Sequence, residues 1–341
     1  MRGPAPRPVL AALDLGTNNC RLLVAAPEDG RGPGFRVLDA FSRIVRLGEG
    51  IGDFGQDFVL SEAAMGRAIK ALKVCAGKMR HHDVARARCV ATEACRRAVN
   101  GAEFVARVRA ETGISLEVLT RQREGELAVS GCAPLISNEA ETVVVFDIGG
   151  GSTEVIWVDL TGPAPQLLGA HSIPCGVVTM AERFGRDRYT AATYAAMVDH
   201  VSDRLAGFKA GDAIARSIVD GSAVQMIGTS GTVTTLAGID LGLARYDRDR
   251  VDGTTLSFTA IERVSMQLAA DDLAGRAANP CIGYVRADLV VGGCAVLEAL
   301  CRAWPVGSLT VADRGVREGL LYEMMTADPD PDARVATCSP H

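Results

Sequence analysis

The chain has 341 residues and a mass of 35.8 kDa, with 48% apolar and 23% charged residues, which excludes a disordered chain and suits two domains of ordinary size. Its net charge of −5 argues against a general nucleic-acid-binding protein, although a locally positive cleft could still hold a small polyanion. The ten cysteines form no CxxC pair and no zinc-like spacing, so we expect buried, reduced thiols, as is typical of the cytoplasm.

The apolar run at residues 9–13 ends at Asp14 and is too short for a signal peptide or a membrane span. We therefore expect a cytoplasmic protein that binds neither a membrane nor a nucleic-acid polymer. The sequence leaves open whether the chain forms a homodimer.

Apolar strands alternate with helices from the start of the chain, which is typical of an α/β fold. A strand is predicted at residues 9–13, followed by a turn at 14–19 and a second strand at 22–26. Ser61 is predicted to N-cap a helix that runs to about residue 79. A short strand is predicted at 88–91.

The next elements complete the first half of the chain. Asn100 and Glu103 form a capping box, which predicts a helix that ends at Gly113. A strand is then predicted at residues 114–119, and a further helix near Gln122.

The second half repeats this order. Strands are predicted at residues 142–146, 154–158 and 225–228, with helices beginning near Thr190 and Thr232. Thr259 and Glu262 suggest another capping box, and apolar helices are predicted at 290–304 and 316–325.

These elements predict two domains without a long linker. The expected parts are a disordered tail at 1–8, an N-terminal domain at 9–133, a C-terminal domain at 134–312, a terminal helix at 313–326 that packs back on the first domain, and a disordered tail at 327–341.

Two loops share one pattern, in which an apolar strand is followed by Asp-x-Gly, small polar residues and another apolar strand. The first begins at Asp14 and the second at Asp147, 133 positions later (147 − 14). Glycines let backbone N–H groups approach phosphate oxygens, and the aspartates suit a divalent cation. One such loop alone is more often a plain hairpin turn, but two matched copies about one domain apart favour a duplicated anion-binding unit.

A third loop supports this interpretation. Gly228, Ser230 and Gly231 lie between a predicted strand and a predicted helix, where backbone donors and a helix N-terminus can meet an anion.

The three loops, in this order, resemble those of the actin/Hsp70/sugar-kinase superfamily. Residues 46–50, 91–100, 146–154 and 312–319 resemble more closely the exopolyphosphatase / guanosine-pentaphosphate phosphatase (Ppx/GppA) family, over nearly the whole chain. The resemblance implies an α/β fold of two actin-like (ribonuclease H-like) domains, with the substrate in an interdomain cleft.

By the same resemblance, Glu124 falls on the position of the catalytic glutamate. From the residues alone, it would be an unremarkable charge on a solvated helix. The surrounding stretch departs from the family pattern, because Arg121, Arg123, Gly125 and Glu126 replace a small residue, an acid, an alanine and a basic residue. We expect Gly125 to loosen the start of the helix by about 1 kcal/mol relative to alanine.

The resemblance also implies ligands for Mg²⁺ and for phosphate. The expected metal ligands, for Mg²⁺ or another divalent cation, are Asp14, Asp147 and Glu154. The expected phosphate-binding residues are Thr17, Asn18, Arg46, Arg96, Gly149, Gly150, Gly151, Ser152, Thr153, Gly228, Ser230, Gly231 and Arg286.

The sequence therefore predicts a phosphoanhydride hydrolase that acts on polyphosphate or guanosine pentaphosphate, with Glu124 as general base. Two alternatives remain open at this point. One is a small-acceptor kinase of the same superfold, and the other is a non-catalytic sensor of polyphosphate or (p)ppGpp.

Overall fold

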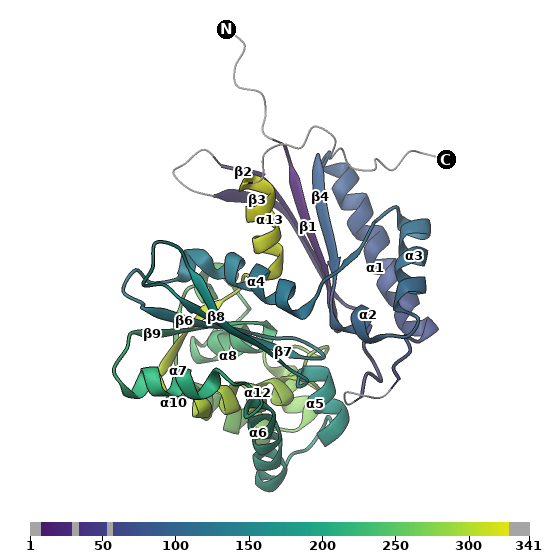
Figure 1. The fold of residues 1–341 in the computed structure, drawn as a ribbon. Helices are drawn as coiled ribbons and strands as arrows, with labels where there is room; N and C mark the ends of the chain where they lie inside the picture. Colours follow the sequence, from purple (N-terminus) through teal and green to yellow (C-terminus); the bar gives the residue numbers. More distant parts are fainter. Residues whose placement is uncertain (1–7, 29–33, 53–56, 327–341) are drawn as a thin grey trace. The chain divides into compact units, whose positions relative to one another are not determined.

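A computed structural model describes residues 8–28, 34–52 and 57–326 of the chain (Figure 1). Its contacts divide the chain into two compact units. Over the described residues, the first comprises 8–28, 34–49, 57–120 and 316–326, and the second comprises 50–52 and 121–315. The division between the units falls between Thr120 and Arg121, because the helix that begins at Arg121 packs on the sheet of the second unit.

Over its described residues, the first unit contains a five-stranded sheet in the order β3-β2-β1-β4-β5. Its strands are β1 (Leu10–Leu15), β2 (Asn19–Pro27), β3 (Phe35–Ile44), β4 (Arg86–Ala91) and β5 (Glu117–Val118). The helices of this unit are α1 (Glu62–His81), α2 (Glu93–Arg97), α3 (Gly101–Thr112) and α13 (Val316–Thr326). β1 is antiparallel to β2 and parallel to β4.

β1 is buried along nearly its whole length, which requires cover on both faces of the sheet. α1 packs on β2 and β3. α13 packs on β1 and β2 (Figure 1). A helix from the far end of the sequence therefore completes the core of the first unit.

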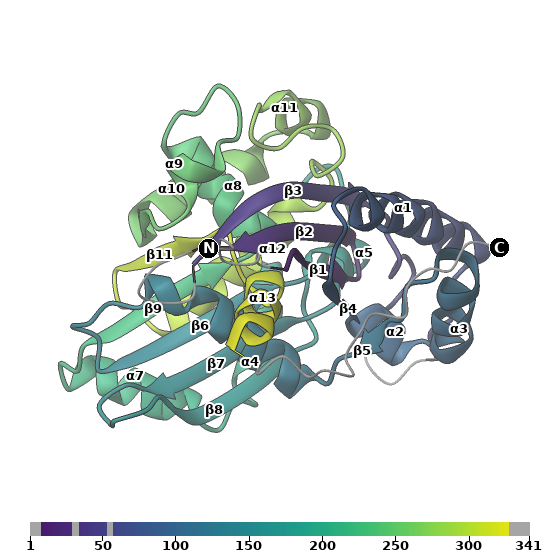
Figure 2. The same ribbon diagram turned by 90° about the horizontal axis from the view of Figure 1, so that it is seen from above.

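Over the described residues, the second unit contains a six-stranded sheet in the order β10-β11-β9-β6-β7-β8. Figure 2 shows its strands from β11 to β8. Its strands are β6 (Thr142–Ile148), β7 (Thr153–Asp159), β8 (Gln166–Ile173), β9 (Val224–Thr229), β10 (Thr255–Ser257) and β11 (Ser308–Ala312). Its helices are α4 (Arg121–Cys132), the 3-10 turn η1 (Ala133–Leu135), α5 (Val177–Phe184), α6 (Ala191–Leu205), α7 (Gly211–Val219), α8 (Gly231–Asp240), α9 (Arg248–Val251), α10 (Phe258–Ala270), α11 (Leu273–Ala278) and α12 (Val290–Ala303).

Alternate residues of β6 enter two different cores, because successive side chains point to opposite faces of a sheet. Val144 and Phe146 belong to the large core that α6, α8, α10 and α12 share. Val143 and Val145 belong to a smaller core under α4. β6 is apolar without interruption because both of its faces are buried.

The two units repeat one another in strand order and in detail. β3-β2-β1-β4-β5 corresponds to β8-β7-β6-β9-β11, with the same parallel and antiparallel pairings. The register between the second and third strands shifts after Val24 in one unit and after Trp157 in the other, again 133 positions apart (157 − 24). The duplication predicted from two loops thus extends to whole sheets.

Most of the predicted elements are confirmed. The Ser61 hydroxyl accepts from Ala64 N at 3.2 Å, as its predicted capping role requires. Gly113 ends α3 with a φ of 74°. The nine described cysteines are free thiols, and all except Cys89 are buried.

Three local predictions are wrong. The Asn100 side chain bonds to the backbone of Leu60 instead of capping α3, at 2.9 Å and 3.0 Å. α10 is capped by Ser257 and not by Thr259. Only two residues of the predicted strand 114–119 pair, in β5. The spacing of residues along the sequence does not show whether a side chain caps its own helix or, like that of Asn100, bonds to a backbone group that is distant in sequence.

The sequence also yielded no prediction for several elements, among them β3, β8 and β11. The predicted tails lie almost entirely outside the described residues. Within the described part of the chain, no helix combines the length and apolarity needed to cross a bilayer.

Candidate active site

The first hairpin loop is closed by a backbone hydrogen bond from Gly16 N to Asn19 O at 2.8 Å. Asp14 is the last residue but one of β1 and lies opposite Arg21. Thr17 and Asn18 are at the tip and are both buried. The Asn18 carbonyl accepts from the amides of Val45 and Arg46 at 2.8 Å and 3.0 Å, which brings Arg46 against this loop.

One buried polar atom of this loop has no protein partner. The Asn18 side-chain oxygen is shielded from solvent and accepts no hydrogen bond from any described residue. Such atoms are rare in folded proteins because they forfeit a hydrogen bond with water. Because this oxygen can only accept, it suits a ligand that donates a hydrogen bond or a cation.

The Asp14 carboxyl is destabilised in its charged form. Burial raises the pKa of Asp14 above its ordinary value, the positive charges of Arg21 and Arg317 lower it, and the negative charge of Glu318 raises it. Burial is the largest of these effects. A cation near this carboxylate would offset the loss of hydration.

The second loop repeats the geometry of the first. Gly149 N donates to Ser152 O at 2.9 Å, and Asp147 lies opposite Glu154 where Asp14 lies opposite Arg21. The carbonyls of Gly149 and Gly150 accept from the first amides of α5, which turns the loop against that helix. A Cβ added at Gly176 would lie 2.4 Å from the Gly150 carbonyl oxygen, so only glycine permits this approach.

Amide groups at the tip of the second loop are available to a ligand. Among the described residues, none accepts a hydrogen bond from the amide of Gly150 or Gly151. Consecutive unpaired amides in a glycine-rich turn are a common way to bind an anion.

The hydroxyls beside this loop are instead engaged within the protein. Ser152 Oγ and Ser172 Oγ both donate to Glu154 Oε1, at 2.7 Å and 2.9 Å, and Thr153 Oγ1 donates to the Cys175 carbonyl at 2.6 Å. These bonds hold the buried Glu154 carboxylate in one orientation. Through these bonds Ser152 and Thr153 also support the loop from within the protein.

The third loop connects β9 to α8. The Ser230 hydroxyl accepts from Thr232 N and Val233 N at 3.2 Å and 3.3 Å and so caps α8. Ser230 has a φ of 150° and a ψ of 169°, a region normally reserved for glycine, which costs about 1–3 kcal/mol. Strain of this size is common at ligand-binding turns.

Gly228 and Gly231 lie on either side of the connection between β9 and α8. Gly228 lies within β9, and an added Cβ would approach the Phe146 ring to 2.6 Å, so packing accounts for glycine there. Gly231 begins α8. Since Asp147 pairs with Thr229 in the parallel register of β6 and β9, the second and third loops lie side by side.

Glu124 lies in the first turn of α4 and is half-buried. The next residue explains one of the departures noted in the sequence, because a Cβ added at Gly125 would lie 2.8 Å from Ile156 Cγ1 of β7. Ile156 and Glu154 point to the same face, as do Val145 and Asp147, and α4 covers that face. Gly125 therefore permits close packing of α4 on the sheet face to which both carboxylates point.

The two remaining arginines are held by neighbouring groups. Arg96 contacts Glu93 and the Leu119 carbonyl within the first unit. Arg286 donates to the Ile282 and Cys281 carbonyls at 3.2 Å and 3.1 Å and lies 3.4 Å from Thr235 Oγ1 of α8. Arg286 thus belongs to the loop before α12.

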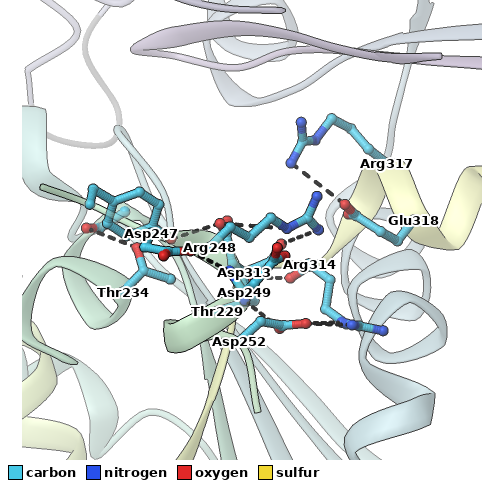
Figure 3. Close-up of polar contacts among 12 residues, drawn as sticks. Thr229, Thr234, Asp247, Arg248, Asp249, Asp252, Asp313, Arg314, Arg317 and Glu318 are labelled. Carbon is cyan, nitrogen blue, oxygen red and sulfur yellow. Dashed lines mark hydrogen bonds and ion pairs between the residues drawn. The ribbon is translucent and has the colours of Figure 1, made fainter. Parts of the chain in front are cut away.

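Sequence reasoning missed a polar network around Asp313 and Arg314 (Figure 3). Asp252 accepts from Asp313 N at 2.9 Å and from Arg314 Nε at 2.9 Å, and Tyr246 and Arg248 donate to Asp313. The Arg314 carbonyl accepts from Thr229 Oγ1 at 2.6 Å. The network thus fixes the segment after β11 against the end of β9.

The same segment also supports α4. Cys132 Sγ lies 3.9 Å from the Arg314 carbonyl, and a Cβ added at Gly131 would lie 2.0 Å from the Gly315 carbonyl oxygen. The backbone after β11 therefore touches both the third loop and the helix that carries Glu124.

Glu318 is a second residue that the sequence reasoning missed. It is 1% exposed, it contacts Arg317 at 3.7 Å, and its charge raises the pKa of Asp14. A signal was present, because the tripeptide Arg-Glu-Gly occurs at residues 123–125 of α4 and again at 317–319 of α13.

Within the described residues, no three His, Cys, Asp or Glu side chains gather as a protein-only metal site. Asp147 and Glu154 form a pair of facing carboxylates, and Asp14 belongs to the other unit. The expected metal ligands are therefore distributed over both units.

Comparison with known proteins agrees with these observations. Over residues 23–328 the chain matches the model of the Ppx/GppA phosphatase family. It is 29% identical to exopolyphosphatase 2 of Mycobacterium tuberculosis, over 92% of this chain and 98% of the relative. It is 30% identical to the guanosine-5'-triphosphate,3'-diphosphate pyrophosphatase of Photobacterium profundum, over 97% of this chain but 62% of the relative.

Solved structures show the same fold. The Ppx-GppA enzyme of Aquifex aeolicus superimposes with a TM-score of 0.73 at 28% identity, over 93% of this chain and 99% of the other. An exopolyphosphatase from Cytophaga hutchinsonii superimposes with a TM-score of 0.80 at 26% identity, over 93% and 97%. The predicted α/β fold with two actin-like units is confirmed, and the chain belongs to the Ppx/GppA phosphatase family.

Proposed function

We propose that this protein hydrolyses the terminal phosphoanhydride bond of inorganic polyphosphate, guanosine pentaphosphate, or both. The observation that carries the proposal is the pair of matching hairpin loops, each closed by a Gly N–H to carbonyl bond and each following an aspartate. The names of the relatives support these two substrates, since one is an exopolyphosphatase and another a guanosine-5'-triphosphate,3'-diphosphate pyrophosphatase.

In this proposal the loops bind the negatively charged phosphates. The amides of Gly150 and Gly151 donate to phosphate oxygens, and the α8 N-terminus at Gly231 adds a favourable dipole. In the first unit, the residues proposed to bind phosphate are Thr17, Asn18 and Arg46. Preorganised donors of this kind stabilise the charge that develops in the transition state.

Glu124 is the proposed general base. It orients a water molecule for in-line attack on the terminal phosphorus and accepts its proton, while the bond to the bridging oxygen breaks and a chain shorter by one phosphate leaves. Its half-buried position on α4, over the sheet face of Asp147 and Glu154, supports this role.

The carboxylates proposed to hold Mg²⁺ are Asp147 and Glu154, with Asp14 as their counterpart in the first unit. They offer only the oxygen donors that Mg²⁺ prefers, and Mg²⁺ commonly takes one or two carboxylates and completes its shell with phosphate oxygens and water. This coordination agrees with the lack of a three-residue cluster over the described residues. When bound, Mg²⁺ neutralises charge on the phosphoryl groups.

The test is phosphate release from polyphosphate and from guanosine pentaphosphate, with and without Mg²⁺. We expect Glu124→Gln to lower kcat by about 10²–10⁴-fold while the protein remains folded. Glu126→Gln is a matched control on the same helix, because among the described residues Glu126 pairs only with Gln122 and Arg123, and it should retain near wild-type activity. Unchanged turnover in Glu124→Gln would exclude Glu124 as the base, and tight binding without phosphate release under any divalent metal would favour a sensor.

A further inference from the structure

Arg96 is already held by a carboxylate of its own short helix. Arg96 Nε donates to Glu93 Oε2 at 3.0 Å, and NH2 donates to the same oxygen at 2.5 Å. Its NH1 donates to the Leu119 carbonyl at 2.5 Å. All three guanidinium nitrogens are engaged, so the orientation of the group is defined by the protein.

The carboxylate in this pair is buried more deeply than the arginine. The Glu93 side chain is 2% exposed, whereas the Arg96 side chain is 16% exposed. The ion pair therefore has a protein-facing side, occupied by Glu93, and a solvent-facing side that belongs to Arg96. A buried carboxylate is costly unless it is paired, and Arg96 meets this requirement.

The pair lies beside the first phosphate-binding loop, within the same unit. Thr92 N, at the start of α2, donates to Leu15 O of that loop at 3.2 Å. A Cβ added at Gly48 would lie 2.2 Å from Thr17 Cγ2 and 3.6 Å from Ala94 Cβ, so α2, Gly48 and Thr17 pack closely together. Arg96 is therefore near the loop without being part of it.

The ion pair between Glu93 and Arg96 affects ligand binding in two ways. The bonds to Glu93 and Leu119 fix the guanidinium in advance, which reduces the entropy lost when a ligand binds. The negative charge of Glu93 also cancels much of the positive charge that Arg96 presents to a polyanion, because charges in contact at low dielectric act as a neutral pair at a distance. The first effect strengthens binding and the second weakens it.

We infer that Glu93 is a positioning residue that sets how strongly Arg96 attracts the phosphates of a polyanionic ligand: it orients the guanidinium and attenuates its charge. The inference rests on the proposed function for the class of ligand, a chain of linked phosphates. Phosphate affinity in the first unit is thus tuned by a carboxylate that does not touch the ligand.

Two substitutions at Glu93 separate orientation from charge. Glu93→Gln keeps an oxygen that accepts from Arg96 but removes the charge, whereas Glu93→Ala removes both. We expect Glu93→Gln to bind inorganic tripolyphosphate about threefold to tenfold more tightly than wild type, measured by titration calorimetry in EDTA at low salt. Glu93→Ala should bind more weakly than Glu93→Gln and should show a lower kcat, because the guanidinium is no longer oriented.

A matched control removes the same charge elsewhere in the first unit. Glu111 also accepts from an arginine on its own helix, Arg107, at 2.9 Å, and from Lys73 at 2.8 Å. Glu111→Gln should leave tripolyphosphate affinity unchanged. The gain in Glu93→Gln should shrink as salt is raised, since it is electrostatic.

A double-mutant cycle tests whether the effect passes through Arg96. In an Arg96→Met background, Glu93→Gln should bring no gain. A gain that persists there, or tripolyphosphate binding by Glu93→Gln equal to that of wild type, would overturn the inference. Arg96→Lys offers a second check if a Glu93 variant does not fold. Lysine cannot contact both Glu93 and the Leu119 carbonyl, so the Arg96→Lys variant should bind tripolyphosphate about tenfold more weakly than wild type.

The result is separable from the proposed hydrolysis, because binding in EDTA does not depend on turnover. If the cycle behaves as expected but wild type releases no phosphate, the hydrolase proposal fails and the role of Glu93 stands. If wild type hydrolyses polyphosphate but Glu93→Gln leaves both KM and the dissociation constant unchanged, the hydrolase proposal stands and the proposed role of Glu93 fails.

Discussion

Asp147 and Glu154 lie directly opposite each other on β6 and β7, with both side chains on the sheet face that α4 covers. Two carboxylates in such a position repel each other in the absence of a cation. The hydroxyls of Ser152 and Ser172 hold Glu154 in place. In the first hairpin, the corresponding pair is Asp14 and Arg21, which attract each other.

This asymmetry predicts where Mg²⁺ dependence originates. Glu154→Gln should raise the Mg²⁺ concentration for half-maximal phosphate release about tenfold or more, because it removes one of two facing carboxylates. Ser172→Ala should have a smaller effect in the same direction, since it removes only one support of Glu154. A Mg²⁺ titration of activity measures both, and an unchanged midpoint in Glu154→Gln would exclude Glu154 as a metal ligand.

Asp14 predicts a conflict between stability and function. Because burial raises the pKa of Asp14 in the folded state, its contribution to stability is complete below the unfolded pKa and is lost as the pH rises through the folded pKa. Asp14→Asn should therefore be more stable than wild type at pH 7 without metal, and the difference should vanish near pH 3, where both side chains are neutral.

The Asp14 prediction is checked by urea unfolding at several pH values in EDTA. Activity should be lost in Asp14→Asn although stability increases. A variant that is less stable than wild type at pH 7 would contradict the account.

Arg276 is predicted to be a major stabilising residue of the second unit. It is 0% exposed and donates to five carbonyls, those of Ala287, Leu268, Asp271, Arg186 and Asp187. Arg276→Met would leave these buried acceptors unpaired and should cost about 3–5 kcal/mol in the free energy of unfolding.

The control for Arg276→Met is Arg302→Met. Arg302 is exposed and, within the part of the chain that the structure describes, pairs only with Glu298 on the same helix, so its loss should cost less than about 1 kcal/mol. Denaturant unfolding followed by circular dichroism compares the two variants. Equal effects would show that the carbonyl cluster adds little.

Gly131 is predicted to be intolerant of any side chain. A Cβ added at Gly131 would lie 2.0 Å from the Gly315 carbonyl oxygen. Because the nearest atoms of Gly315 all belong to the backbone, α4 would have to shift. Gly131→Ala should destabilise the protein by about 1–3 kcal/mol and lower kcat more than KM, because α4 carries Glu124.

Gly66→Ala provides the comparison for Gly131→Ala. Gly66 lies in α1 with nothing within 4 Å of an added Cβ, and the substitution should stabilise that helix by about 0.5–1 kcal/mol. Thermal unfolding and phosphate release measure both variants. Wild-type kcat in Gly131→Ala would show that the position of α4 does not matter for the reaction.

Much of the fold could be predicted because its signals are local. Uninterrupted apolar residues around Val144 indicated a strand, and glycines and aspartates at Asp14 and Asp147 indicated two equivalent turns. These features depend on side-chain period and on backbone freedom, which neighbouring residues determine. The Ser61 cap and the Gly113 end of α3 are of the same kind.

Other features depend on residues far apart in the sequence, and only the tertiary structure decided them. α4 packs with the second sheet because Gly125 fits against Ile156 and Gly131 against Gly315, and α13 packs with the first sheet and brings Glu318 near Asp14. Glu93 and Arg96 are close in sequence, but the burial of one and the orientation of the other come from the surrounding core.

The sequence by itself determined the α/β class, the duplicated loops and the kind of ligand they suit, because these follow from local residue chemistry. The tertiary structure decided which carboxylates face each other, which arginine is already neutralised and which helix covers which sheet. Those properties are set by packing and desolvation, which arise only when distant segments come together.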